Sequence, residues 1–290
     1  MKRVSELGEF LKAKRAAVSP EAVGLPAVGN PRRVPGLRRE EVALLASVSV
    51  DHYTRLEQGR VSAASENLLA GIARALRLTA AEHEYLRMLV QTRPRRGRYD
   101  EPEVGAPLRD LLAALTAPAL VLGPRTDVLA WNAGAAALFL DFAEIPVAQR
   151  ALVRMVFLEP RIRGLFVNWH QVAAEAVDRL RMAAARAPGD PRLTRLVGEL
   201  SVHDADFRRW WGGHGVRTLA GGRKHLRHPV VGELELDWQV LQVLTAQDQT
   251  MLAYTAPEGS PSHEALRILS SWNADAPVLR PTPEAEHDGM

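Results

Sequence analysis

The stretch LRREEVALLASVSVDHYTRLEQGR, residues 37–60, decides the fold of the N-terminal part of the chain. Its apolar residues recur at helical spacing in two short segments with a narrow gap between them. We predict helices over residues 38–46 and 50–58, with Ser49 capping the second helix and Gly59 ending it. Helices of so few turns are not stable alone in water, so both must pack against a larger core.

Three further helices complete this predicted all-α domain, which we place at residues 1–92. A helix near the N-terminus carries Leu7, Phe10 and Leu11 on one face. Another is expected over residues 65–76, and the last follows a capping box made by Thr79 and Glu82.

The fragment REEVALLASVSVDHYTRLEQG resembles the lambda-repressor-like (XRE-type) helix-turn-helix, in which the second helix lies in the DNA major groove. Matched residue by residue, the resemblance implies that Val50, Asp51 and Arg55 reach base edges and that Arg39 contacts a phosphate. Ser47 is a departure, because the family usually has glycine in the turn. Serine can adopt that backbone at a small cost.

Other polar residues around the two helices extend the candidate DNA interface. Tyr53 and Leu56 face the core, which leaves the residues between them outward. Arginines at both ends need only reach a phosphate, although they could equally be solvated surface charges. Val50 is either a core residue or a contact to a thymine methyl group. The candidate DNA-binding residues are Arg38, Arg39, Ser49, Val50, Asp51, His52, Thr54, Arg55 and Arg60.

Charge divides the chain in the same way. Residues 1–99 hold 18 Lys and Arg against 10 Asp and Glu, a net +8, whereas residues 100–290 carry a net −5. A basic segment joined to an acidic one predicts a polyanion-binding module attached to something else. The Pro-, Gly- and charge-rich stretch at 93–104 is the expected linker.

The remainder predicts an α+β domain with one antiparallel sheet and helices over one of its faces. A helix at 107–115 precedes a β-hairpin with strands 119–122 and 128–131, and Asn132 caps the next helix. We expect one long helix over 163–187, a helix beginning at Asp190-Pro191, strands around 233–240 and 251–255, and a final helix after Ser262. The segment GGRKH is expected to form a turn.

The fragments VLAWNAGAAALF, FVNWHQVAAEAVDRLR, DPRLTRLVGELSVHDADFRRWW and HPVVGELELDWQVL resemble the ligand-binding domain of MmyB-like transcription regulators. The resemblance covers about residues 105–272, and we place the domain at 105–275 with a flexible tail at 276–290. It implies a PAS-like fold and a small apolar ligand, with a fatty acid as the best candidate. Asn168 and Gly215 stand where the family tends to have aspartate, which puts polar contacts there in doubt.

Six tryptophans all lie in this second domain, and large aromatic side chains can line an apolar pocket. For any single tryptophan, the alternative is a core position. Trp210 and Trp211 are adjacent in a helix and cannot share a face. The candidate ligand-binding residues are Trp131, Phe166, Trp169, Phe207, Trp210, Trp211 and His214.

The sequence offers no convincing catalytic or metal-binding motif. The chain has no cysteine, and His203 and His214 have no Cys or His partner at a ligand spacing. His225 and His228 have the spacing of metal ligands on a helix, but Pro229 follows and predicts an extended segment. We therefore expect no enzyme activity, no cofactor and no metal. With no signal peptide and no membrane-spanning run, a cytoplasmic location is expected.

The leading hypothesis is a transcriptional regulator that binds double-stranded DNA as a homodimer and senses a small apolar ligand. The alternative is a DNA-binding regulator whose second domain serves only for dimerisation or protein interaction.

Overall fold

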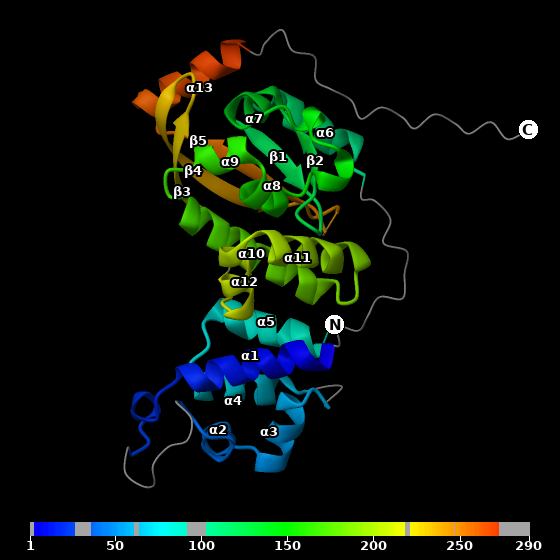
Figure 1. The fold of residues 1–290 in the computed structure, drawn as a ribbon, viewed down its shortest axis with the longest axis vertical. Helices are drawn as coiled ribbons and strands as arrows, with labels where there is room; N and C mark the ends of the chain where they lie inside the picture. Colours follow the sequence, from blue (N-terminus) through cyan, green and yellow to red (C-terminus); the bar gives the residue numbers. More distant parts are fainter. Residues whose placement is uncertain are drawn as a thin grey trace, which may run out of the picture. The chain divides into compact units, whose positions relative to one another are not determined.

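The computed structural model describes residues 3–26, 36–60, 64–91, 103–217, 221–246 and 248–272. The chain forms two compact units, each assembled from two separate stretches (Figure 1). Unit 1 comprises residues 1–100 and 173–219, and unit 2 comprises residues 101–172 and 220–290. The predicted tail at 276–290 and most of the predicted linker at 93–104 lie outside the described residues.

Unit 1 is helical, and its first hundred residues contain the five helices that the sequence predicts. These are α1 (Arg3–Ala17), α2 (Arg39–Leu45), α3 (Val50–Glu57), α4 (Glu66–Ala75) and α5 (Ala80–Gln91), with a 3-10 turn at Glu21–Val23. Leu7, Phe10 and Leu11 are buried, as the helical pattern of α1 predicts. The second stretch adds most of α10 (Trp169–Arg186), α11 (Pro191–His203) and α12 (Ala205–Gly212).

Polar contacts join α1 to α5. The Lys14 Nζ lies 2.5 Å from a carboxylate oxygen of Glu82, and the Tyr85 hydroxyl donates to Glu6 at 2.8 Å. The predicted capping box is present, since Glu82 accepts from the Thr79 N–H and the Glu82 N–H donates to the Thr79 hydroxyl. Burial acts to raise the pKa of Glu82, but the bonds from Lys14 and Thr79 outweigh it and lower that pKa.

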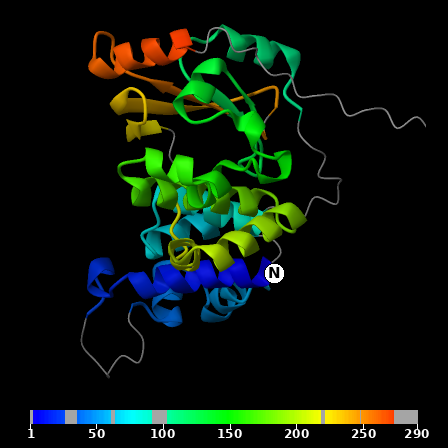
Figure 2. The same ribbon diagram turned by 45° about the horizontal axis from the view of Figure 1, so that its top comes forward.

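Unit 2 contains a five-stranded antiparallel sheet in the order β2-β1-β5-β4-β3, which confirms the predicted α+β class. The strands are β1 (Ala119–Leu122), β2 (Val128–Trp131), β3 (Gly221–His228), β4 (Gly232–Gln242) and β5 (Thr250–Thr255). Around them lie α6 (Ala106–Ala114), α7 (Ala133–Leu138), α8 (Leu152–Leu158), α9 (Pro160–Leu165), the start of α10, and α13 (Pro261–Trp272), with 3-10 turns at Phe142–Glu144 and Val147–Gln149. Both views show α13 beside β4 (Figures 1 and 2).

The prediction that helices cover one face of the sheet is wrong at its centre. Leu112 of α6 packs with Val121 and Met251 on one face, while Leu252 and Tyr254 are buried on the other. Successive residues of a strand point to opposite faces, so the central strand β5 and its neighbour β1 are covered on both faces. Over β3 and β4, the face of the sheet that α6 covers at β1 and β5 carries exposed ion pairs instead of apolar contacts.

The segment GGRKH is not a turn but the first part of β3, which is a correction to the sequence analysis. Buried and exposed residues alternate along β3 as in other strands, and the buried positions are Lys224, Leu226 and His228. Because two of these three residues are polar, the sequence shows no alternation of apolar and polar residues here. The Nζ of Lys224 lies 4.8 Å from the centroid of the Trp238 ring. At Gly222, with φ of +158°, an added Cβ would meet the same indole at 3.3 Å, so glycine suits this close approach.

The single long helix predicted over 163–187 is also wrong. The chain forms α9 and α10 with a break at Phe166, because this residue makes an isolated β-bridge with Leu226 of β3. The Val167 N–H then donates to the His225 carbonyl at 3.0 Å. These bonds replace helical ones, although the apolar spacing continues through the break.

No helix within the described ranges is long and apolar enough to span a bilayer.

Candidate functional site

The hairpin of α2 and α3 is built by local backbone and capping bonds. Ser47, between the helices, has φ of +58°, which confirms that serine adopts the left-handed backbone expected of glycine. The Val48 N–H closes the end of α2 on the Ala43 carbonyl at 2.9 Å. Ser49 then caps α3, since its hydroxyl accepts from the His52 N–H at 3.1 Å.

The structure presents the predicted DNA-binding residues on the outside of this hairpin. On α3, Asp51 and Arg55 are exposed and lie one turn apart. Val50 is 46% exposed, which excludes a fully buried core position for it. The remaining members are exposed or partly buried: Arg38, Arg39, Ser49, His52, Thr54 and Arg60.

A buried carboxylate, which the sequence analysis missed, holds the hairpin against α1. Glu57 at the end of α3 is 2% exposed, and its Oε1 lies 3.0 Å from the Nε of Arg15 on α1. Its other oxygen accepts from the Nε of Arg39 at the start of α2. Arg15 also donates to the Leu37 carbonyl at 2.9 Å. One carboxylate thus joins three helices, and Arg39 keeps 44% of its side chain exposed toward solvent.

The close approach of α1 to α3 explains a glycine in the first helix. An added Cβ at Gly8 would lie 2.3 Å from the Glu57 carbonyl oxygen. Any larger side chain would therefore push α1 away from the end of α3 and strain the contacts made by Glu57.

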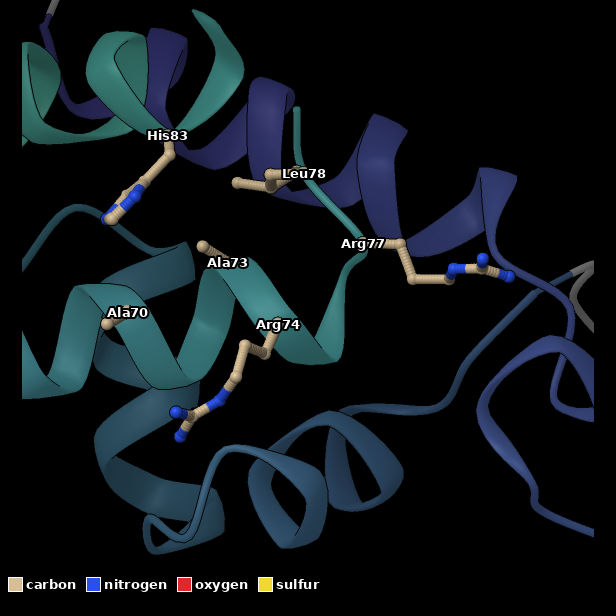
Figure 3. Close-up of a pocket in the computed structure, with 6 residues that line it drawn as sticks. All are labelled: Ala70, Ala73, Arg74, Arg77, Leu78 and His83. Carbon is tan, nitrogen blue, oxygen red and sulfur yellow. The ribbon is translucent and has the colours of Figure 1, made fainter. Parts of the chain in front are cut away.

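A hollow of ≈470 Å³ lies elsewhere in unit 1, between α4 and α5 (Figure 3). Ala70, Ala73 and Leu78 supply its apolar wall, with His83 at one side. The other lining residues, Arg74 and Arg77, extend away from that wall in Figure 3. None of the predicted ligand-binding residues lines this hollow.

In unit 2, a chain of aromatic rings surrounds two of the predicted ligand-binding residues. Trp131 packs against Phe142 at 5.3 Å between ring centroids, and Phe139 lies between Phe142 and Phe166 at 6.4 Å from each. Phe139 also meets the Tyr254 ring edge-on at 5.1 Å. The cluster therefore joins β2, the turn after α7, the α9–α10 break and β5.

Trp169 is anchored as a core residue at the start of α10. Its indole N–H donates to the Val156 carbonyl at 2.8 Å, and its ring meets Phe157 edge-on. The Arg163 guanidinium lies over the same ring, with its carbon 3.5 Å from the ring centroid. These contacts favour the core alternative that the sequence left open for each tryptophan.

The other four predicted ligand-binding residues lie in unit 1. Phe207 and Trp211 stack one turn apart on α12, with ring centroids 5.7 Å apart and planes 10° apart. Trp210 points elsewhere, beside the Arg209 guanidinium. Burial, together with the nearby Arg181 guanidinium, lowers the pKa of His214. The candidate set is thus divided, with Trp131, Phe166 and Trp169 in unit 2 and the rest in unit 1.

Comparison with known families gives two matches. A family model for the MmyB-like transcription regulator ligand binding domain matches residues 104–269. A family model for a helix-turn-helix domain matches residues 6–86. No curated protein matches the chain.

Proposed function

Because the chain belongs to the family defined by the MmyB-like transcription regulator ligand binding domain and carries a helix-turn-helix domain, we propose that it is a DNA-binding regulator controlled by a small apolar ligand such as a fatty acid. The observation that carries the DNA-binding half is the outward face of α3, where Asp51 and Arg55 are exposed on a helix held rigidly by Glu57. We assign α3 to the major groove, in the manner of XRE-type regulators.

Two kinds of contact divide the proposed DNA interface. Val50, Asp51 and Arg55 would read base edges, because they lie on the outer face of α3. Arg38, Arg39 and Arg60 would contact phosphates, which add affinity without sequence preference. Arg39 can do so while bonded to Glu57, because nearly half of its side chain is exposed.

For the second domain, the antiparallel sheet of unit 2 supports a PAS-like description. The aromatic cluster around Phe139 supports an apolar ligand, because such rings supply the walls of most small-molecule pockets. The alternative, a domain used only for dimerisation or protein interaction, predicts that these rings fill the space completely. We propose no catalytic role and a cytoplasmic location.

Arg55→Ala tests base reading. We expect it to weaken binding to the selected operator by about 1–3 kcal/mol and to relax preference at one base pair, because a bidentate contact to a base is lost. Arg38→Ala is the matched comparison, and it should weaken all sequences alike and reduce the salt slope by about one unit. Fluorescence anisotropy on selected and scrambled duplexes measures both effects. Equal weakening by Arg55→Ala on both duplexes would reduce Arg55 to a phosphate contact.

A homodimer on DNA is expected because one recognition helix covers only a few base pairs. The operator should then contain inverted half-sites about one helical turn apart. Analytical ultracentrifugation of the protein on its selected duplex measures the stoichiometry, and one protomer per duplex would contradict this proposal.

Ligand binding is tested by thermal shift with saturated fatty acids of increasing chain length. A ligand at ~100-fold excess over its Kd should stabilise the fold by about 2.7 kcal/mol. Trp131→Leu and Trp210→Leu, one in each unit, would show which group of aromatic residues the ligand contacts. If no fatty acid of any chain length stabilises the protein, the result would favour a second domain that serves only for dimerisation or protein interaction.

A further inference from the structure

Arg181 of α10 is an arginine with almost no solvent contact, since only 1% of its surface is exposed. Its Nη2 donates to the carbonyls of Trp210, at 3.3 Å, and Trp211. Its Nη1 lies 3.4 Å from the Nδ1 of His214, which acts as the acceptor because a guanidinium can only donate. The Trp211 ring lies 4.5 Å from the guanidinium carbon. The buried Arg181 guanidinium therefore binds both the last turn of α12 and His214, which follows that helix.

The helix that carries Arg181 also contributes to the core of the helices that carry the DNA-binding hairpin. The Tyr85 hydroxyl donates to Glu6 across the α1–α5 contact, and Arg181 opposes the rise in the Tyr85 pKa that burial and the Glu6 carboxylate cause. Around it, the hydrophobic core of α1–α5 includes Met182, Ala185 and Val216. Residues from the segment matched by the ligand-binding family model thus complete the core of unit 1.

Burying a charge is unfavourable unless its hydrogen-bonding groups find partners. If the last turn of α12 moved away from α10, the Arg181 guanidinium would lose its hydrogen bonds to two carbonyl groups and its contact with the Trp211 ring. It would still be shielded from water that could replace those contacts. The movement would then disturb α10, which contributes Met182 and Ala185 to the core of α1–α5. A displacement of α12 is therefore energetically linked to the helices behind α3.

We infer that Arg181 is a positioning residue that makes α12 and helices α1–α5 one cooperative unit, so that α12 is the element through which the second domain acts on the DNA-binding hairpin. The regulatory part of this inference rests on the proposed function. The cooperative part rests on the contacts of Arg181 with α12 and His214 and on the core that Met182, Ala185 and Val216 share with helices α1–α5.

Hydrogen exchange of the full-length protein tests the cooperative part without ligand or DNA. In the parent, amides of α12 and α5 should exchange through a shared opening, with the same dependence on urea. Arg181→Met keeps most of the side-chain volume but removes every donor. Exchange in α12 should then become roughly 10- to 100-fold faster and lose the urea dependence that it shares with α5.

Arg186→Met, an exposed position on the same helix, is the matched control and should change neither rate. A merely structural role for Arg181 would raise both rates together and leave the urea dependences equal, and that result would overturn the inference. Independent exchange of α12 in the parent would overturn it too. If Arg181→Met does not fold, Arg181→Lys takes its place, because lysine keeps the charge but cannot span both carbonyls and the ring.

The regulatory part is tested by the effect of dodecanoate on affinity for the duplex that the parent selects from a random pool. We expect dodecanoate to change the parent's Kd and the change to disappear, to a ratio of about one, in Arg181→Met. A variant that retains the parent's ratio would contradict the regulatory part. If the parent selects no duplex, or no fatty acid of the thermal-shift series changes its Kd, the proposed function fails, while the exchange result still decides whether Arg181 couples the helices.

Discussion

Replacing Glu57 with glutamine should lower the free energy of unfolding of unit 1 by about 3–5 kcal/mol, the usual cost of removing one partner from a buried ion pair. The carboxylate is 2% exposed and accepts from both Arg15 and Arg39. Glutamine has nearly the same shape but offers one neutral acceptor oxygen. The two guanidinium groups would then lose their counter-charge, and Arg15 would suffer more because it is the more buried. Urea denaturation followed by circular dichroism measures the loss.

The two arginines give this prediction an internal ranking. The Arg15 side chain is 14% exposed and that of Arg39 is 44% exposed, so solvent can replace the lost carboxylate only around Arg39. Arg15→Met should therefore destabilise the protein clearly more than Arg39→Met. Glu40→Gln, at an exposed site on α2, is the control and should change stability by no more than about 0.5 kcal/mol. A Glu57→Gln protein as stable as this control would show that the carboxylate does not hold the hairpin.

Asn132 should be the most sensitive polar position of unit 2, because its amide makes four hydrogen bonds while only 4% exposed. The oxygen accepts from the Ala119 and Ala135 N–H groups at 3.0 and 2.9 Å. The nitrogen donates to the Leu115 and Ala117 carbonyls at 3.0 and 2.8 Å. Asn132→Ala removes the hydrogen-bond partner of these four backbone groups, and we expect the free energy of unfolding to fall by roughly 3–6 kcal/mol.

Asn132→Asp separates the accepted bonds from the donated ones. The carboxylate still caps α7 but faces two carbonyl oxygens, so the charged form is disfavoured in the fold and the folded-state pKa of the new side chain is raised. Its deficit relative to the parent should be largest at neutral pH, shrink as the pH falls through the raised folded-state pKa, and be smallest below about 4, the unfolded-state pKa, where the acid can donate one bond in the fold. Asn67→Asp on the exposed side of α4 is the control. Equal stability of Asn132→Asp and the parent at pH 7 would contradict the bonding of this amide.

The parts of the fold that were predicted correctly depend on local signals. Ser49 and Asn132 cap helices because their side chains reach N–H groups three residues later, and β1 and β2 follow from a short apolar hairpin. The outward face of α3 follows from the spacing of Tyr53 and Leu56. Each of these depends on residues near one another in the chain, so sequence patterns suffice.

The features that were missed depend on distant partners. The break at Phe166 is decided by Leu226, and β3 is hidden because Lys224 and His228 occupy its buried positions. Glu57 could have been suspected, since it lies one turn after Tyr53 on the inward face of α3. Its partner Arg15 is 42 residues away, however, and no spacing rule connects them. The contacts of Arg181 are equally beyond any local pattern.

The division of unit 1 into two stretches has a consequence for the chain during its synthesis. The ribosome finishes helices α1–α5 well before it makes Met182, Ala185 and Val216, which belong to the same core. At ~5–20 residues per second, the wait lasts roughly 6–24 s. Throughout that interval the nascent helices lack the part of their apolar cover that these three residues supply. The complete core of unit 1 is available only once much of the sensor sequence has left the ribosome, so we expect a chain truncated after α5 to be less stable than the full-length protein.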